Sequence, residues 1–373
     1  MKKQEIYLDN NATTFLDPSV KETLVSFLEA PHGNPSSTHT FGQEVRSIID
    51  RYRRQISHYF NVRPNEIIFT SSGSESMGFL IRGCLENHRQ GHLITSNLEH
   101  ATVKKTVALY EKKGFSVTYL PGHARGCIEP DTLLKAIKPD TKLITIIGAN
   151  NETGVKNPIA EIALIAKEAK IPLVVDAVSW LGKDSFSIPD GVVGMGFSGH
   201  KIHALQGIGV AYIKAGLKPQ PLINGTQEYG LRGGTENLLG IVSFGEAIAR
   251  LSPDSITKIA SLRDYFETRL LESITNIKIN GEGPRISNTS NVAFMGVDGE
   301  SLLIALDQSG IAASHGSACS AGALEPSPVL INMGIPLEQV RSSIRFSLSR
   351  FTTKEEIDQT ISILVGLIKK LRR

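Results

Sequence analysis

The segment Leu173-Val174-Val175-Asp176 is followed, a short distance along the chain, by the segment Ser198-Gly199-His200-Lys201. The first is an apolar run that is typical of a strand buried on both faces, and it ends in a carboxylate. The second puts a lysine in a small, polar turn. A pyridoxal-phosphate site requires such a pair, because a lysine amine forms a Schiff base with the cofactor aldehyde while a carboxylate keeps the pyridine nitrogen protonated. We therefore predict that Asp176 and Lys201 hold opposite ends of one cofactor.

Taken singly, these two residues also have ordinary interpretations. An aspartate after a strand is usually a turn residue, and a lysine is usually solvated. Their spacing, together with the polar hydrogen-bond donors that precede Lys201, favours the cofactor site.

Around these segments, short β-rich runs alternate with helical patterns, as they do around a mainly parallel sheet with helices on both faces. The expected strands are 67–70, 92–95, 117–120, 143–147, 173–175 and 192–197. The expected helices are 76–86, 101–113, 130–137 and 159–170. The sequence therefore predicts an α/β fold whose large domain is built on a mainly parallel sheet.

Beyond Gly245 the order of elements changes to an α+β arrangement. Helical patterns lie at 256–274 and 300–308, strand patterns lie at 291–294, 311–313 and 343–347, and a last helix is expected from the capping box at 353–356 to Arg373. We expect a large domain over 15–249 and a smaller domain formed by 1–14 and 250–373, with no Pro- or Ser-rich linker between them.

Composition limits the possible functions. The chain has 373 residues, 40% of them apolar, which is enough for a large core. Its 40 Lys and Arg are spread along the chain and nearly balanced by 37 Asp and Glu, which argues against nucleic acid as a partner. The start lacks a secretory apolar region and no stretch is long enough to cross a membrane, so we expect a cytoplasmic protein. Cys84, Cys127 and Cys319 are too few and too scattered for a disulfide framework or a zinc site, and we expect no metal.

A candidate phosphate site lies in the run from Phe69 to Ser76, where a strand, a small polar turn and a helix start are expected. Unpaired backbone amides at a helix start bind phosphate well, and the positive end of the helix dipole adds to this. Taken alone, an ordinary serine N-cap is the commoner explanation of such a turn.

Two residues of the C-terminal part are candidates for the chemistry. Cys319 lies among small, polar and glycine residues from Ser314 to Ala323, which predicts an accessible loop and a thiol that can act as a nucleophile. Cys84 lies in an apolar helical pattern, which predicts an inert thiol. Arg345 is a charge inside a strand pattern and needs a partner, either a substrate carboxylate or a structural salt bridge with an Asp or Glu.

Together these residues resemble one family. The chain is similar, nearly end to end, to cysteine desulfurases of the NifS/IscS type, within the class V aminotransferase group of fold-type I pyridoxal-phosphate enzymes. The motifs that carry the resemblance are Tyr7 to Thr14, Gly33 to Ser37, Glu99-His100, Asn150 to Gly154, Val175 to Ala177, Ser198 to Lys201, Leu231 to Thr235, Gly316 to Cys319, Leu324 to Ser327 and Ser343 to Leu348. Such motifs in order are far more specific than any one of them.

The resemblance implies a role for each matched residue. Lys201 would hold the cofactor, Asp176 would pair with the pyridine nitrogen, and His100 would stack on the ring and take part in proton transfer. The phosphate would be bound by Gly73, Ser74, Ser198 and His200, and also by Thr235, which would reach across from the partner subunit of a homodimer. The substrate carboxylate would be held by Arg345 and Asn151, with Asn34 also in the substrate site. Asn151 and Ser179 would also contact the cofactor.

The implied reaction converts L-cysteine to L-alanine and leaves the sulfur on Cys319 as a persulfide. An iron-sulfur scaffold or a thiolation carrier would then accept the sulfur. The chain departs from the family at Ser179, where a glutamine commonly bonds the phenolic oxygen of the cofactor. Two other functions stay open: a selenocysteine lyase or other class V pyridoxal-phosphate lyase, and a non-catalytic scaffold with the same fold.

Overall fold

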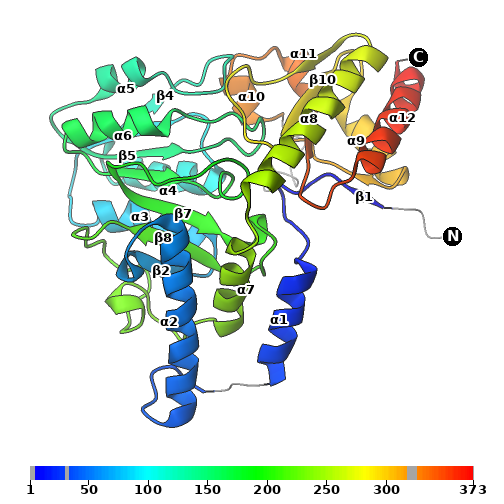
Figure 1. Ribbon diagram of the computed structural model, residues 1–373. Helices are drawn as coiled ribbons and strands as arrows, with labels where there is room; N and C mark the ends of the chain where they lie inside the picture. Colours follow the sequence, from blue (N-terminus) through cyan, green and yellow to red (C-terminus); the bar gives the residue numbers. More distant parts are fainter. Residues whose placement is uncertain (1–4, 30–32, 317–325, 373) are drawn as a thin grey trace.

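The computed structural model describes residues 5–29, 33–316 and 326–372, and it is built around a central sheet (Figure 1). The sheet has seven strands in the order β2-β8-β7-β6-β5-β3-β4. They are β2 (Ile67–Thr70), β3 (His92–Ser96), β4 (Ser116–Leu120), β5 (Thr141–Ile147), β6 (Leu173–Asp176), β7 (Val192–Ser198) and β8 (Gly209–Ile213). Within this sheet β8 runs antiparallel to both of its neighbours, and the other neighbouring pairs are parallel. The predicted mainly parallel sheet is thus confirmed.

Helices cover both faces of the sheet, as the apolar strands predict. The helices of this part are α1 (Pro18–Glu29), α2 (Thr40–Phe60), α3 (Gly73–Leu85), α4 (Ala101–Lys112), α5 (Pro130–Ala136), α6 (Ile159–Glu168) and α7 (Leu238–Ile248). Leu173 and Val175 belong to one hydrophobic cluster, to which α2, α6 and α7 also contribute buried side chains. Val174, between them, belongs to a second cluster supplied by α3 and α4. Successive residues of β6 therefore pack against opposite helical layers.

The C-terminal part has a second sheet and its own core. β9 (Ile277–Ile279), β10 (Thr289–Phe294) and β12 (Ser343–Ser347) pair antiparallel in the order β12-β10-β9. The N-terminal β1 (Ile6–Tyr7) pairs with β11 (Ile311–Ala312), which brings the start of the chain to this part. Its helices are α8 (Pro253–Ser273), α9 (Gly299–Gln308), α10 (Pro328–Asn332), α11 (Leu337–Arg341) and α12 (Lys354–Leu371). The domain boundary expected after residue 249 stays a prediction.

Sequence and structure differ at some element ends. α3 begins at Gly73 and not at Ser76, because the Ser72 side chain caps the helix by accepting a hydrogen bond from the Glu75 amide. α12 follows the predicted capping box but ends at Leu371. The sequence did not predict several elements of the structure, namely β1, α1, α2, β8, α7, β9, α10 and α11.

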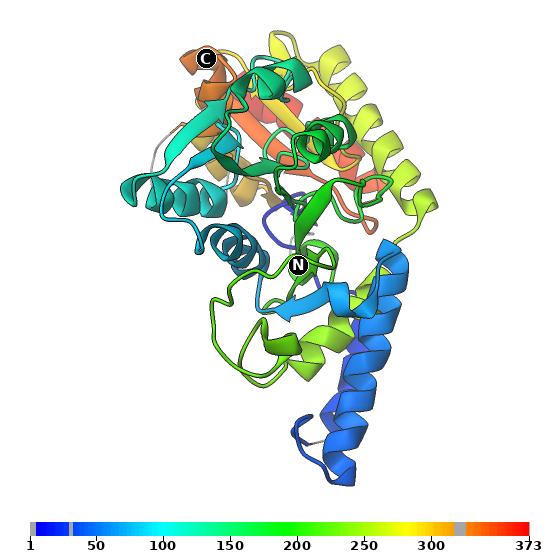
Figure 2. The same ribbon diagram turned by 90° about the vertical axis from the view of Figure 1, so that its left-hand side faces the viewer.

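Two further features concern the helices. α1 and α2 extend away from the central sheet (Figure 2). Across the described residues, no helix has both the length and the apolar character that crossing a bilayer needs.

Candidate active site

A cavity lies at the carboxyl ends of the parallel strands, where α/β sheets usually bind ligands. The volume within it that the centre of a water molecule can occupy is about 160 Å³. Its wall contains most of the expected site residues, namely Gly73, Ser74, His100, Asn151, Asp176, Ser179, Ser198, His200, Lys201 and Arg345. The structure thus brings together residues that the sequence separates by more than two hundred positions.

The start of α3 forms one end of the cavity. Ser72 is its N-cap and Gly73 its first residue, so the amides of the first turn face a site open to an anion. A Cβ on Gly73 would lie 2.5 Å from Cγ2 of Val178 and 3.2 Å from Cβ of Ser198. Glycine is therefore needed for the close approach of these segments, and the cradle that it leaves has the chemistry of a phosphate site.

His200 lies at the same end, in the short helix η2 (Gly199–Lys201). Its Nδ1 hydrogen bonds with the Thr13 hydroxyl at 3.1 Å. Burial, together with the charge of Lys201, lowers the pKa of His200 to about 4. The imidazole is therefore neutral at physiological pH, and one ring nitrogen can serve as a hydrogen-bond donor to an anion.

Asp176 ends β6 and also lines the cavity. Its side chain accepts a hydrogen bond of 3.0 Å from the Val178 amide. Burial raises the pKa of Asp176, while His100, this hydrogen bond and Lys201 oppose that effect. A protonated ring nitrogen placed beside this carboxylate would compensate the cost of burying its charge.

Glu99 is a second buried carboxyl near Asp176. It accepts hydrogen bonds from the Ser96 hydroxyl at 2.5 Å and the Ile147 amide at 2.9 Å. Burial raises the pKa of Glu99 to about 8 against these hydrogen bonds, and the charge of Asp176 adds to the increase. Glu99 is therefore mostly protonated at neutral pH.

Lys201 and His100 approach the cavity from different segments. Lys201 is the last residue of η2, and its Nζ donates to the backbone carbonyls of Asn11 and, at 2.7 Å, Ala12. His100 caps α4, and its Nδ1 accepts a hydrogen bond of 3.2 Å from the Thr102 amide. This contact requires that His100 carry its ring proton on Nε2 when neutral.

The sequence left two kinds of partner open for Arg345, a substrate carboxylate or a salt bridge with an Asp or Glu. The structure contains such a salt bridge. Its Nη2 lies 2.7 Å from Oδ1 of Asp9, and its Nη1 donates to the Asn151 carbonyl at 3.0 Å. The side chain is 1% exposed, and its Nε has no hydrogen-bond partner among the residues that the structure describes. Because Arg345 also lines the cavity, this guanidinium is fixed in place and has a donor to spare.

Some expected residues are not part of this cavity. Asn34 is exposed and accepts a hydrogen bond from the Ser36 amide in a turn before α2. Thr235 is exposed and lies outside the cavity wall. Cys319 lies outside the described residues. The thiols of Cys84 and Cys127 are poor nucleophiles, because burial raises the pKa of Cys84 to about 12 and also raises that of Cys127.

Several residues of the wall have no role that the sequence predicts. Asn11 and Ala12 contribute the carbonyls that hold Lys201, and Met77, Thr102 and Val178 complete the surface. The consecutive asparagines Asn10-Asn11 after β1 are the signal that could have identified the first of these.

Comparison with known proteins places this site in a family. The model described as aminotransferase class V matches residues 6–360. The cysteine desulfurase IscS of Dictyoglomus turgidum is 42% identical over 99% of this chain and 96% of its own length. Cysteine desulfurase 2 of Trichormus variabilis is 41% identical over 98% of this chain and 94% of its own length.

Solved structures agree with these relatives. A NifS-like protein matches with a TM-score of 0.91 and 32% identity, over 99% of this chain and 100% of the other. A structure of SspA in complex with cysteine matches with a TM-score of 0.84 and 32% identity, over 94% of this chain and 100% of the other. The expected fold, that of fold-type I pyridoxal-phosphate enzymes, is confirmed. The chain belongs to the aminotransferase class V family, among its NifS- and IscS-like members.

Proposed function

We propose that this chain is a cysteine desulfurase that uses pyridoxal 5′-phosphate to convert L-cysteine to L-alanine. One observation carries the proposal: Lys201, Asp176 and Arg345 line a single cavity, so groups for the cofactor and for an amino-acid carboxylate lie side by side. The relatives named cysteine desulfurase, which match this chain over nearly its whole length, support the same reaction.

The residues of the cavity fit pyridoxal 5′-phosphate. The glycine cradle at α3 and the neutral His200 suit its phosphate, together with Ser74 and Ser198. The Asp176 carboxylate can pair with its pyridine nitrogen, and the Lys201 amine can bond to its aldehyde. When bound, the cofactor supplies an electron-withdrawing ring that stabilises negative charge on the α-carbon of the substrate. Ser179, a buried residue of the wall, would contact the cofactor in place of the glutamine that is common in the family.

The chain's own residues move the protons and hold the substrate. Lys201 removes the α-proton and returns it, and the carbonyls of Asn11 and Ala12 hold its amine between these transfers. His100 takes part in proton transfer at the same face. Arg345 binds the substrate carboxylate with Asn151, and Asn34 belongs to the substrate site.

The sulfur step uses Cys319, which lies outside the described residues. Its thiolate attacks the substrate sulfur, so an S–S bond forms while the bond between Cβ and sulfur breaks. The electron pair of the broken bond stays on Cβ, which takes up a proton and becomes the methyl group of alanine. The enzyme keeps a persulfide, and no external oxidant is needed.

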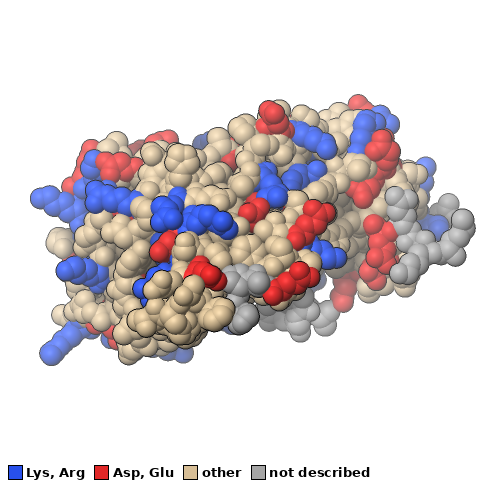
Figure 3. Space-filling model, turned by 60° about the horizontal axis from the view of Figure 1, so that its bottom comes forward, with Lys and Arg blue, Asp and Glu red and all other residues tan. Residues whose placement is uncertain are grey.

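Partners and location go beyond the reaction. We propose an iron-sulfur scaffold or a thiolation carrier as the sulfur acceptor, and a homodimer in which Thr235 reaches the phosphate of the partner subunit. Exposed Thr235 and exposed apolar side chains on α1 support the dimer. Basic and acidic side chains are mixed over the face in Figure 3, which supports a protein that does not bind nucleic acid. The cytoplasmic location stays a prediction.

The alternatives differ in substrate or in cofactor binding. A selenocysteine lyase would consume selenocysteine much faster than cysteine, and the names of the relatives favour the desulfurase. A scaffold protein would stay colourless with pyridoxal 5′-phosphate, whereas the gathered Lys201, Asp176 and Arg345 favour an enzyme.

The deciding test is release of alanine and sulfide from L-cysteine with a reductant. We expect equal yields from the yellow wild-type protein, no product from Cys319→Ala, and full activity from the matched control Cys84→Ala, whose thiol is inert. A cofactor-loaded wild type that forms no alanine would refute the proposal, as would a Cys319→Ala variant with normal activity.

A further inference from the structure

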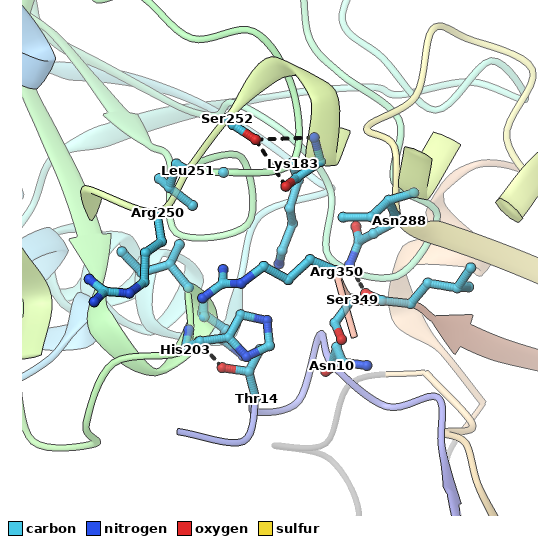
Figure 4. A pocket seen from close by; sticks show the side chains of 16 residues that line it. Asn10, Thr14, Lys183, His203, Arg250, Leu251, Ser252, Asn288, Ser349 and Arg350 are labelled. Carbon is cyan, nitrogen blue, oxygen red and sulfur yellow. Dashed lines mark hydrogen bonds between the residues drawn. The ribbon is translucent and has the colours of Figure 1, made fainter. Parts of the chain in front are cut away.

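A second, smaller pocket behind Lys201 contains a buried lysine to which the reaction described above assigns no role (Figure 4). The volume of the pocket that the centre of a water molecule can occupy is about 30 Å³. Lys183, Asn288 and Arg350 are among the residues that line it. Lys183 is 5% exposed, and its Nζ donates to Oδ1 of Asn11 at 3.2 Å. Within the described residues, no carboxylate forms an ion pair with it.

The surroundings of Lys183 disfavour a charged amine. Burial lowers the pKa of Lys183 well below its ordinary value, and the charges of Lys201 and Arg345 lower it further. His200 and His203 also lie close enough for their titration to be coupled to that of Lys183, and burial lowers the pKa of both imidazoles to about 4. The two charged groups that act most on Lys183 among the described residues, Lys201 and Arg345, are both basic. An unpaired ammonium here would be costly, so the folded protein holds a neutral amine.

The acceptor of this amine, Asn11, uses both ends of its side-chain amide. Its Oδ1 accepts from Lys183 and, at 3.0 Å, from Nδ2 of Asn288. Its Nδ2 donates to Oγ1 of Thr289 at 2.8 Å and to the Asn151 carbonyl at 3.0 Å. The two donors to Oδ1 therefore fix which way the Asn11 amide points.

Asn11 in turn connects the two halves of the active site. Its backbone carbonyl accepts a hydrogen bond from Nζ of Lys201. The Asn151 carbonyl, which Asn11 holds, accepts the hydrogen bond from Arg345 at 3.0 Å. A continuous chain of hydrogen bonds therefore runs from Lys183 through Asn11 to Lys201 on one side and to Arg345 on the other.

We propose that Lys183 is a positioning residue: its neutral amine fixes Asn11, which holds the Lys201 amine and the Asn151 peptide that supports Arg345. A neutral donor suits this task because an ammonium would repel both cations that the site needs. The proposal rests on the proposed function for the identity of the reaction, whereas the hydrogen-bond chain does not depend on the substrate.

The test compares two lysine-to-methionine variants of the holoenzyme. Lys183→Met keeps the apolar stem and removes the donor. We expect the pH titration of the cofactor absorbance, which reports protonation of the Lys201 nitrogen, to shift to lower pH because the Asn11 carbonyl is no longer held. We also expect KM for L-cysteine to rise about three- to tenfold, as the loss of one hydrogen bond predicts. The control, Lys156→Met, removes a lysine paired with Asp184 and should change neither quantity.

A second readout uses the protein without cofactor. A lowered lysine pKa in the folded state means that stability falls as pH drops below the ordinary lysine value of about 10.4, because the unfolded chain binds the proton more tightly. Lys183→Met should therefore gain stability over the wild type at neutral pH, and this gain should shrink as the pH approaches that value. A gain that does not vary with pH would contradict the neutral amine.

Unchanged absorbance titration and KM in Lys183→Met would overturn the proposal. If this variant does not fold, Asn288→Ala removes the other donor to Asn11 and should shift the titration in the same direction; no shift would again overturn it. A shifted titration in an enzyme that forms no alanine from L-cysteine would support the positioning role while refuting the desulfurase function.

Discussion

At the scale of single residues, burial decides which groups of the site are charged. His200 and Glu99 are both neutral near physiological pH, since burial lowers the pKa of the imidazole to about 4 and raises that of the carboxyl to about 8. Burial raises the pKa of Asp176 as well, so its negative charge depends on a cationic partner such as a protonated ring nitrogen. The sequence indicates the residue types, but protonation depends on burial by distant segments and cannot be read from neighbours in the chain.

Glu99 gives a pH-dependent prediction at this scale. Its folded-state pKa of about 8 lies above the ordinary 4.5, so the folded protein binds this proton more tightly than the unfolded chain. The stability that it contributes is complete below the ordinary value and is lost as pH rises through about 8. Glu99→Gln mimics the protonated form, so its free energy of unfolding should exceed that of the wild type increasingly from acid to alkaline pH, by up to several kcal/mol at about 1.4 kcal/mol per pKa unit. Urea titrations across this range measure the difference, and a difference that is flat with pH would contradict the assignment.

At the scale of elements, the sequence predicts those helices and strands whose signals lie within a few neighbouring residues. The apolar runs of β5, β6 and β7 and the capping box of α12 have signals within a few residues, and the structure has these elements nearly where expected. The early start of α3 has a local cause as well, the Ser72 cap. By contrast, β8 lies antiparallel in a parallel sheet because of its partners β2 and β7, and no pattern inside it indicates that pairing.

The start of α3 gives a prediction at this scale. In Gly73→Ala the new Cβ would lie 2.5 Å from a Val178 methyl group, so the strand ends and the helix must move apart. We expect pyridoxal 5′-phosphate to bind more weakly by about 1–3 kcal/mol, the usual cost of overpacking. Fluorescence titration of the protein without cofactor measures this affinity.

A matched control lies on the same helix. At Gly78 the nearest atom to an added Cβ is Cδ1 of Leu222 at 3.8 Å, an ordinary contact. Gly78→Ala should keep the affinity and favour the helix slightly, because alanine has the higher helix propensity. Equal affinity in both variants would show that the cradle at Gly73 does not hold the phosphate.

At the scale of the whole molecule, the site depends on contacts that no local pattern specifies. Asp9 reaches Arg345 and Asn11 reaches Lys201 because β1 pairs with β11 and so brings the N-terminal segment between the two sheets. The sequence therefore predicts the residues of the cavity but not the partners that position them. The roles of Asn34, Thr235 and Cys319 come from the family resemblance alone. They stay predictions, because none of the three is among the residues that line this cavity.

The exposed helices lead to a prediction about assembly. α1 and α2 extend beyond the sheet as an arm (Figures 1 and 2), and on α1 Leu28 is 70% exposed and Val25 is 49% exposed. Burying a leucine of this kind contributes about 1.5–3 kcal/mol, which a second copy of the chain can gain. We expect sedimentation velocity to show a dimer for the wild type and a shift to monomer for Leu28→Asp, since a buried charge without a partner is costly. Leu134→Asp is the control, because Leu134 on α5 is 58% exposed on a distant part of the molecule and should leave the dimer intact. A monomeric wild type would exclude the homodimer, whereas a dimer that resists Leu28→Asp would exclude α1 from its interface.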